Sequence, residues 1–217
     1  MALALPLVSS KASQVKPLIS ARRNRAFDPS QLVEFNRHDS LPTSDNSFWR
    51  IESGYVRTFT WSADGDPIPL GFWKAGDIVG PVIAQVRPYE VQCLSPVTAS
   101  HLGRTYAFPR EAVLAQVRQT NELLRISHCR QAEQSLLTFL CWLADRFGQV
   151  TDEGIAVPIK LIHQDIADSI GVARVTVTRL LKKLDREGQI RWSVQEKVVY
   201  RQTFAQFFLD TNYQLTL

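Results

Sequence analysis

The run from His163 to Leu184 constrains the fold more than any other part of the chain. Ala167 and Gly171 stand four residues apart in it, and apolar residues recur around them at helical spacing. Two helices that cross at about 90 to 120° need a small residue at their closest approach and a glycine where the first helix reverses. We therefore predict helices near 163–170 and 174–187, with every polar residue pointing outward. The expected inward positions are Ile166, Ile170, Val172, Val177 and Leu180.

The charge around the second of these helices points to DNA. Residues 171–201 hold eight basic and three acidic side chains, whereas the net charge of the whole chain is only +4. The N-terminal half of such a helix can enter a major groove. An arginine fork suits the O6 and N7 acceptors of guanine, and valine methyls suit the thymine methyl. We predict base contacts by Arg174, Val175 and Arg179.

Other polar residues of the run are suited to DNA phosphates, which position a domain without specifying sequence. The predicted phosphate contacts are His163, Gln164, Thr176, Thr178, Lys182 and Lys183. A charged hairpin, with strands at 189–194 and 197–201, follows the helices. The alternative, a solvated amphipathic helix of a helical core, explains neither this hairpin nor the spacing of Ala167 and Gly171.

The N-terminal half of the chain has the pattern of an all-β unit. Short runs rich in β-branched and aromatic residues lie at 48–51, 55–61, 68–73, 90–94 and 99–102. Turn sequences separate them, and Asp64-Gly65 is a hairpin signal. Many short strands with regularly spaced turns predict a β-sandwich or barrel-like roll.

Between these regions, residues 110–147 contain no glycine or proline, and Gly148 supplies a stop. Val113, Val117 and Leu124 give partial helical spacing. A helix of this length exceeds the usual globular size, so it either breaks once or runs as a dimer seam. Two ordinary core helices, or a subunit-pairing helix followed by a second helix, both fit the pattern.

Composition excludes several classes of protein. Apolar residues make up 45% and charged residues 21%, which is typical of a folded domain. No apolar run approaches the roughly 18 residues of a membrane span. The opening MALALPLVSS lacks the preceding basic residues of a secretory signal, so we expect a cytoplasmic protein. Cys93, Cys129 and Cys141 form no CxxC pair, which argues against a disulfide framework or a four-thiolate metal site.

The order of roll, long helix, helix-turn-helix and hairpin resembles the CRP/FNR family of bacterial transcription regulators over roughly residues 31–205. The segments 51–56 and 75–80 match the family's roll strands and turns. Residues 174–181 are similar to the recognition helix of the cyanobacterial global nitrogen regulators. The resemblance implies an α+β fold with an irregular N-terminal arm at 1–30, a β-roll like a cyclic-nucleotide-binding jelly roll at 31–108, a long helical dimerisation region at 109–147 and a winged helix-turn-helix at 148–217.

The resemblance also implies a homodimer that binds a two-fold symmetric site on double-stranded DNA and acts beside RNA polymerase. Within this interpretation we expect no enzyme activity, no catalytic residues, no metal and no cofactor. The effector stays open: an organic acid such as 2-oxoglutarate follows from the resemblance to the nitrogen regulators, and a regulator without an effector is an equal alternative. Arg87 is the candidate residue of an effector pocket.

The chain departs from the family pattern at several positions. Pro81 stands where cyclic-nucleotide-binding members have the glutamate that binds ribose, and Pro88 follows Arg87 directly. We therefore expect that the phosphate-binding helix cannot form and that cyclic nucleotides are not bound. The N-terminal cysteine cluster of oxygen sensors is absent. Val175 replaces a common glutamate, and Ile162 replaces the usual Ser or Thr cap of the first helix.

A rival hypothesis from another class is a cupin-like enzyme whose helix-turn-helix is a protein-interaction module. It needs a metal cluster, but the roll offers only His38 and His101, with no HxH motif. A second alternative concerns Cys129 and Cys141, which lie on the long helical stretch, where oxidation could alter subunit pairing; inert packing thiols are the simpler interpretation.

Overall fold

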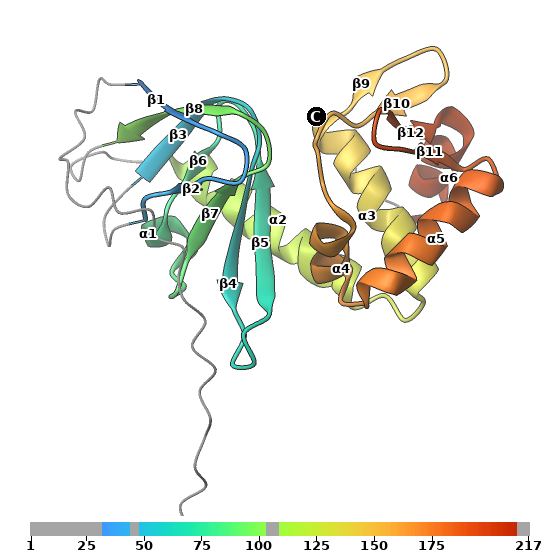
Figure 1. Cartoon of the computed structure of the whole chain (residues 1–217), viewed down its shortest axis with the longest axis horizontal. Helices are drawn as coiled ribbons and strands as arrows, with labels where there is room; N and C mark the ends of the chain where they lie inside the picture. Colours follow the sequence, from blue (N-terminus) through green and yellow to red (C-terminus); the bar gives the residue numbers. More distant parts are fainter. Residues whose placement is uncertain (1–31, 44–47, 103–108, 212–217) are drawn as a thin grey trace, which may run out of the picture.

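The computed structural model describes residues 32–43, 48–102 and 109–211. The predicted N-terminal arm at 1–30 lies outside these residues. In the described part, a β-rich unit and a helical unit stand on either side of a long helix (Figure 1). None of the described helices is both long and apolar enough to span a membrane.

The N-terminal unit consists of two antiparallel sheets of four strands each. One sheet has the order β1 (Leu32–Phe35), β8 (Val97–Leu102), β3 (Phe48–Ser53), β6 (Ile78–Val79). The other has the order β2 (Ser40–Leu41), β7 (Glu90–Cys93), β4 (Val56–Trp61), β5 (Pro67–Trp73). Fully buried Trp49, Ile51, Trp73 and Val91 fill the core of this roll. The predicted β-roll is confirmed.

The segment after β6 contains a short helix. We expected that the phosphate-binding helix of the family cannot form there, and α1 (Pro81–Ala84) makes a single helical turn. Pro81 occupies the first turn, where its missing N–H has no intrahelical partner to lose and its fixed φ favours the helix. The helix ends at Gln85, which has a positive φ of 54°. Pro81 is therefore compatible with a helix at this position, and the helix ends before Arg87.

The long helical stretch breaks once. Helix α2 (Arg110–Ser127) and helix α3 (Ala132–Phe147) are joined by residues 128–131, and the Gly148 N–H bonds the Ala144 carbonyl at the end of α3. Cys129 lies in this connection and not within a helix, contrary to our expectation, whereas Cys141 is buried on α3. The two cysteines are therefore in different environments.

Side chains of helix α2 form hydrogen bonds with the backbone of the edge strand of the second sheet. Strand β5 is an edge strand, so its outward N–H and C=O groups lack a neighbouring strand. Gln119, which is buried, accepts a 3.2 Å hydrogen bond from the Phe72 N–H and donates its amide to the Phe72 carbonyl. Gln116 donates to the Leu70 carbonyl at 3.2 Å. The side chains of α2 thus replace the missing strand.

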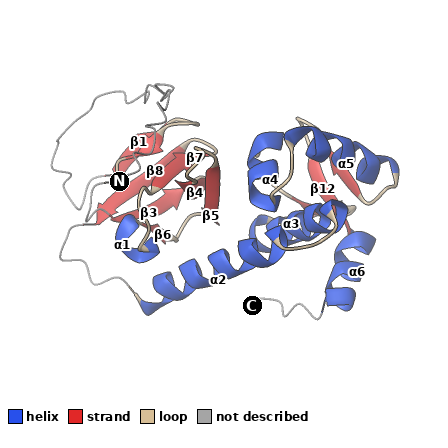
Figure 2. Ribbon diagram, turned by 90° about the horizontal axis from the view of Figure 1, so that it is seen from below, coloured by secondary structure: helices blue, strands red, loops and turns tan. Residues whose placement is uncertain are grey.

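The C-terminal unit has the predicted winged architecture (Figure 2). Helices α4 (His163–Ile170) and α5 (Arg174–Arg186) match the two predicted helices. The sheet beside them has the order β11 (Ile190–Trp192), β12 (Lys197–Tyr200), β10 (Gly154–Ala156), β9 (Gln149–Val150). Helix α6 (Arg201–Thr211), which follows β12, was not predicted.

One hydrophobic cluster spans the two units. Phe72 and Leu94 from the roll belong to the same buried cluster as the interior of α3, α4 and α5. The ring centroid of Phe72 lies 5.8 Å from that of Phe139 and 6.0 Å from that of Trp142 on α3. The roll and the winged unit therefore share a core instead of being joined only by a linker.

The corner between α4 and α5 generates the first prediction. Gly171 has φ +68° and open space where a Cβ would stand, so a side chain there meets only backbone strain. Gly171→Ala should lower the free energy of unfolding by about 1 kcal/mol, and Gly171→Asn by less, because asparagine tolerates the left-handed region. Urea unfolding followed by circular dichroism measures both. Equal losses for the two variants would show that steric contact, not φ, limits this site.

Candidate DNA interface

The helix-turn-helix corner is built as the spacing of Ala167 and Gly171 predicted. The Gly171 and Val172 N–H groups both bond the Ala167 carbonyl at the end of α4, and Ala167 is 1% exposed where α4 meets α5. Four of the five expected inward residues, Ile166, Ile170, Val177 and Leu180, are buried, and Val172 is partly buried. The first helix therefore holds the second in a fixed crossing.

The expectation that every polar residue of this run points outward is wrong. Asp165 and Ser169 are 5% and 3% exposed. Asp165 Oδ2 accepts a 2.9 Å hydrogen bond from the Ile162 N–H, and Ser169 Oγ donates to the Asp165 carbonyl at 2.7 Å. Ile162 itself gives no side-chain cap. The Asp165 carboxylate thus supplies one half of a capping box by accepting from the Ile162 N–H, whereas Ile162 has no hydroxyl to accept the reciprocal bond from the Asp165 N–H.

The outward surface of α5 presents the three residues predicted to contact bases. Arg174, Val175 and Arg179 lie in the N-terminal half of the helix; Arg174 and Val175 are exposed, and Arg179 is accessible and has no ion pair among the described residues. Val175 is 76% exposed. Single exposed apolar residues are common on proteins, so the case for this surface rests on the two accessible arginines that flank Val175.

Two residues predicted to contact phosphates, His163 and Thr178, are hydrogen-bonded to each other. His163 Nδ1 lies 2.8 Å from Thr178 Oγ1, and that hydroxyl donates to the Arg174 carbonyl at 3.1 Å. Because the hydroxyl proton is used, Nδ1 must carry the proton of this bond, which leaves Nε2 for other partners. Burial lowers the pKa of His163, and the charges of Arg174, Lys182 and Lys197 lower it further.

The remaining predicted phosphate contacts differ in their surroundings. Lys182 is exposed, and Thr176 is partly buried. Gln164 donates to Asp168 Oδ1 at 2.7 Å on the surface of α4. Lys183 Nζ lies 2.6 Å from Glu133 Oε2 on α3 and 3.7 Å from Glu187 Oε1. Lys183 therefore pairs within the protein, whereas Lys182 extends into solvent.

The cationic side chains of the wing, which is formed by β11 and β12, also contact other residues of the protein. Arg191 Nη1 lies 2.8 Å from Glu153 Oε2 and 3.1 Å from Glu196 Oε2. Lys197 Nζ stands 5.8 Å from the centre of the Trp192 ring. The tip of the wing is uncharged at Val194, which is 97% exposed. Part of the basic excess counted in the sequence is thus neutralised in the folded protein.

The remaining candidates lie away from this surface. Arg87 is exposed and follows α1. Helix α1 belongs to the roll, and α5 belongs to the unit on the other side of α2 (Figure 1). His38 lies in the turn before β2, and His101 is on β8. Among the described residues there is no group of three or more His, Cys, Asp or Glu side chains placed to hold a metal.

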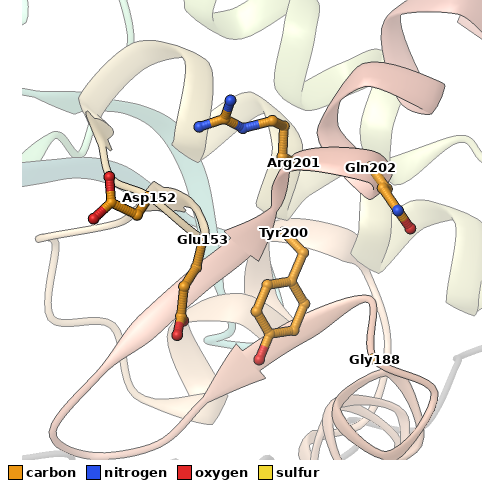
Figure 3. Close-up of a pocket in the computed structure, with 6 residues that line it drawn as sticks. All are labelled: Asp152, Glu153, Gly188, Tyr200, Arg201 and Gln202. Carbon is orange, nitrogen blue, oxygen red and sulfur yellow. The ribbon is translucent and has the colours of Figure 1, made fainter.

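An open pocket of about 540 Å³ lies at the foot of the wing (Figure 3). It is lined by Asp152, Glu153, Gly188, Tyr200, Arg201 and Gln202. Two of its charged groups already have protein partners, since Glu153 pairs with Arg191 and the Arg201 guanidinium donates to the Thr151 carbonyl at 3.3 Å. Sequence reasoning did not single out this pocket, and its residues supply no catalytic arrangement.

His163 generates a prediction for stability against pH. Because its pKa is lowered in the folded protein, the fold favours the neutral ring, and stability should fall as pH drops through the unfolded value of 6.5. His163→Gln keeps a donor for Thr178 but removes this titration. The difference in unfolding free energy between the two proteins, measured by urea denaturation, should therefore move in favour of the variant as pH falls from above the unfolded value to below it. A difference that is constant with pH would contradict the assignment.

Comparisons with known proteins agree with this geometry. Residues 134–202 match the model of the Crp-like helix-turn-helix domain. The chain is 38% identical over 165 residues to the regulatory protein CysR of Synechococcus elongatus, covering 75% of this chain and 80% of that protein. It is 35% identical over 95 residues to the global nitrogen regulator of Synechocystis, covering 44% and 42% of the two chains.

Solved structures with little sequence identity share the fold. A CRP-family transcriptional regulator from Thermus thermophilus superposes with a TM-score of 0.64 at 20% identity, over 84% of this chain and 98% of that one. FixK2 from Bradyrhizobium japonicum gives 0.65 at 16% identity, over 81% and 96%. The cupin-like alternative is not favoured by these comparisons. With a matching helix-turn-helix, an extensive relative and the same architecture, the chain belongs to the CRP/FNR family of transcription regulators.

Proposed function

We propose that this regulator acts as a homodimer on a two-fold symmetric site in duplex DNA, with one helix α5 in the major groove of each half-site. The observation that carries the proposal is the accessible set Arg174, Val175 and Arg179 on the N-terminal half of a helix whose other face is buried. Because DNA is its partner, we place the protein in the cytoplasm and expect it to act beside RNA polymerase.

Within this proposal, base and phosphate contacts are divided among the residues by their reach. The two arginines contact guanine edges and the valine packs on a thymine methyl. Lys182, Gln164 and Thr176 meet phosphates. His163 and Thr178 contribute less, because their protons already bond within the protein. Lys183 contributes less than Lys182, because Glu133 already holds its ammonium group.

The surface of α2 supports a second copy of the chain as partner. One face of the helix is buried against β5 and α3, but Val113, Val117 and Leu124 on the other face are 36%, 48% and 57% exposed. Spacings of four and seven residues place these side chains along one stripe. An apolar stripe on a long helix, here interrupted at Thr120 and Asn121, is the usual seam of a helix pair. We therefore assign dimerisation to residues 109–147, between a roll at 31–108 and a winged unit at 148–217.

We also propose that the roll does not respond to cyclic nucleotides. The turn after β6 holds Pro81 in place of an acidic ribose ligand, and α1 ends before Arg87. The loop that carries Arg87 is exposed, with Pro88 directly behind it. Any effector would use other chemistry, and none is assigned.

The division of contacts leads to a prediction for DNA binding. Arg179→Ala should cost about 1 to 3 kcal/mol on the cognate duplex and relax specificity at one base pair, because a bidentate base contact is lost. Lys182→Ala should weaken binding to all duplexes about equally and reduce the salt slope by about 1. Fluorescence anisotropy on cognate and random duplexes over a range of salt concentrations measures both. Equal losses on the two duplexes for Arg179→Ala would refute its role in base recognition.

The dimer seam leads to a further prediction. Leu124→Glu puts a charge into the proposed seam at an exposed position, so the protomer should fold normally and sediment as a monomer. Val150→Glu is the matched control, because Val150 is 81% exposed on β9, away from α2. Sedimentation velocity measures the mass of each variant. A dimeric Leu124→Glu protein would place the subunit interface elsewhere.

A further inference from the structure

A buried ionic contact connects the roll to the first helix of the helix-turn-helix. Arg57 Nη1 on β4 lies 2.6 Å from Asp165 Oδ1 and 3.7 Å from Asp168 Oδ2 on α4. The arginine side chain is 13% exposed, and each aspartate side chain is 7% exposed. Helix α4 stands between the second sheet and α5, so this contact lies at the boundary of the two units (Figure 1).

Contacts within the roll orient the side chain of Arg57 independently of α4. Arg57 Nε donates a 2.9 Å hydrogen bond to Gln92 Oε1, on the residue directly opposite it in strand β7. Its guanidinium carbon lies 5.1 Å from the centre of the Phe59 ring, two residues along the same strand. The guanidinium therefore has a fixed direction that is set by the sheet and not by the helix.

The helix side of the contact carries an excess of negative charge. Asp165 and Asp168 are three residues apart on one face of α4 and share this guanidinium. Asp168 Oδ2 is buried and accepts no hydrogen bond within the described residues. Burial raises the pKa of Asp168, the Gln164 hydrogen bond and Arg57 oppose the rise, and Asp165 and Asp66 add to it. Without Arg57, two carboxylates would be left buried without the cation that now pairs with them.

Hydrogen bonds connect the start of α4 to the first turn of α5. Asp165 also caps α4 through its second oxygen, so the residue that meets Arg57 sets the start of the helix. Two residues before it, His163 bonds Thr178, which bonds the Arg174 carbonyl in the first turn of α5. These contacts therefore connect Arg57 on the roll, through α4, to the first turn of α5.

We propose that Arg57 is a positioning residue for DNA recognition: its ion pair with Asp165 and Asp168 holds α4, and through it α5, in the orientation that presents Arg174 and Arg179 to DNA. In the present arrangement these arginines are accessible to solvent. The ion pair therefore stabilises the orientation in which both arginines are accessible. In some proteins a buried ion pair fixes one arrangement of elements instead of adding stability, and that is the use inferred here.

The test replaces Arg57 in the full-length protein, and it rests on the proposed DNA-binding function for one of its two readouts. Arg57→Met keeps much of the length of the side chain without its charge. It should weaken binding to the cognate duplex roughly 2- to 30-fold. The substitution should also speed amide hydrogen exchange in α4, because the helix loses its ionic contact with the roll. Arg57→Lys, which keeps the cation, should restore most of both properties.

Two further variants separate positioning from general destabilisation. Asp168→Asn combined with Arg57→Met removes one uncompensated carboxylate, so the double variant should bind cognate DNA more tightly than Arg57→Met alone. Arg50→Met is the matched control. Arg50 pairs with Glu52 at 3.0 Å on the surface of the same roll, and its side chain is 47% exposed. Its loss should leave DNA binding and exchange in α4 unchanged.

Each outcome either supports or overturns the role of Arg57. Unchanged affinity and unchanged exchange for Arg57→Met would overturn the proposal, as would tighter DNA binding, which would mean that the pair holds an orientation unsuited to DNA. Failure of Arg57→Lys to restore binding and exchange would also overturn it. If the unaltered protein bound no duplex in a salt-dependent manner, the proposed function would fail. Hydrogen exchange in α4 would still show whether Arg57 holds this helix against the roll.

Discussion

The attachment of α2 and α3 to the edge of strand β5 is the constraint on which the rest of the structure depends. The side chain of Phe72 enters the aromatic group of Phe139 and Trp142, while its backbone N–H and C=O are held by Gln119 of α2. Helix α3 is also the platform on which α4 and α5 pack. The shared core therefore fixes where α5 lies relative to the roll, and the positioning role proposed for Arg57 adds to it.

Fewer cations of the winged unit face solvent without an acidic partner than the count of basic residues in the sequence suggests. Eight basic residues in 171–201 implied a broadly basic surface. In the structure, Glu133 engages Lys183, and Glu153 and Glu196 engage Arg191. The other cations of α5 lie along its outward face. Internal pairing thus concentrates the charge that faces solvent on one helix, which suits insertion into a groove better than a diffuse basic patch.

What the sequence by itself determined are the features that short-range geometry dictates. Ala167, Gly171 and the apolar spacing around them specified the helix-turn-helix, because crossing helices need a small residue and a left-handed residue at those positions. Asp64-Gly65 specified the β4–β5 hairpin, and the run without glycine or proline specified the helices at 110–147. The short strands β2 and β6 have two residues each, too few to show a period, so only their partners define them.

The tertiary structure alone decided which distant groups meet. Nothing near Asp165 in the sequence shows that it is buried, since its partner Arg57 comes from another domain. The bonds of Gln119 to Phe72 and of Lys183 to Glu133 likewise join residues 47 and 50 positions apart. Such pairs form because packing removes water from both partners at once, and each polar group that loses water must then find a partner among the groups that packing has brought beside it.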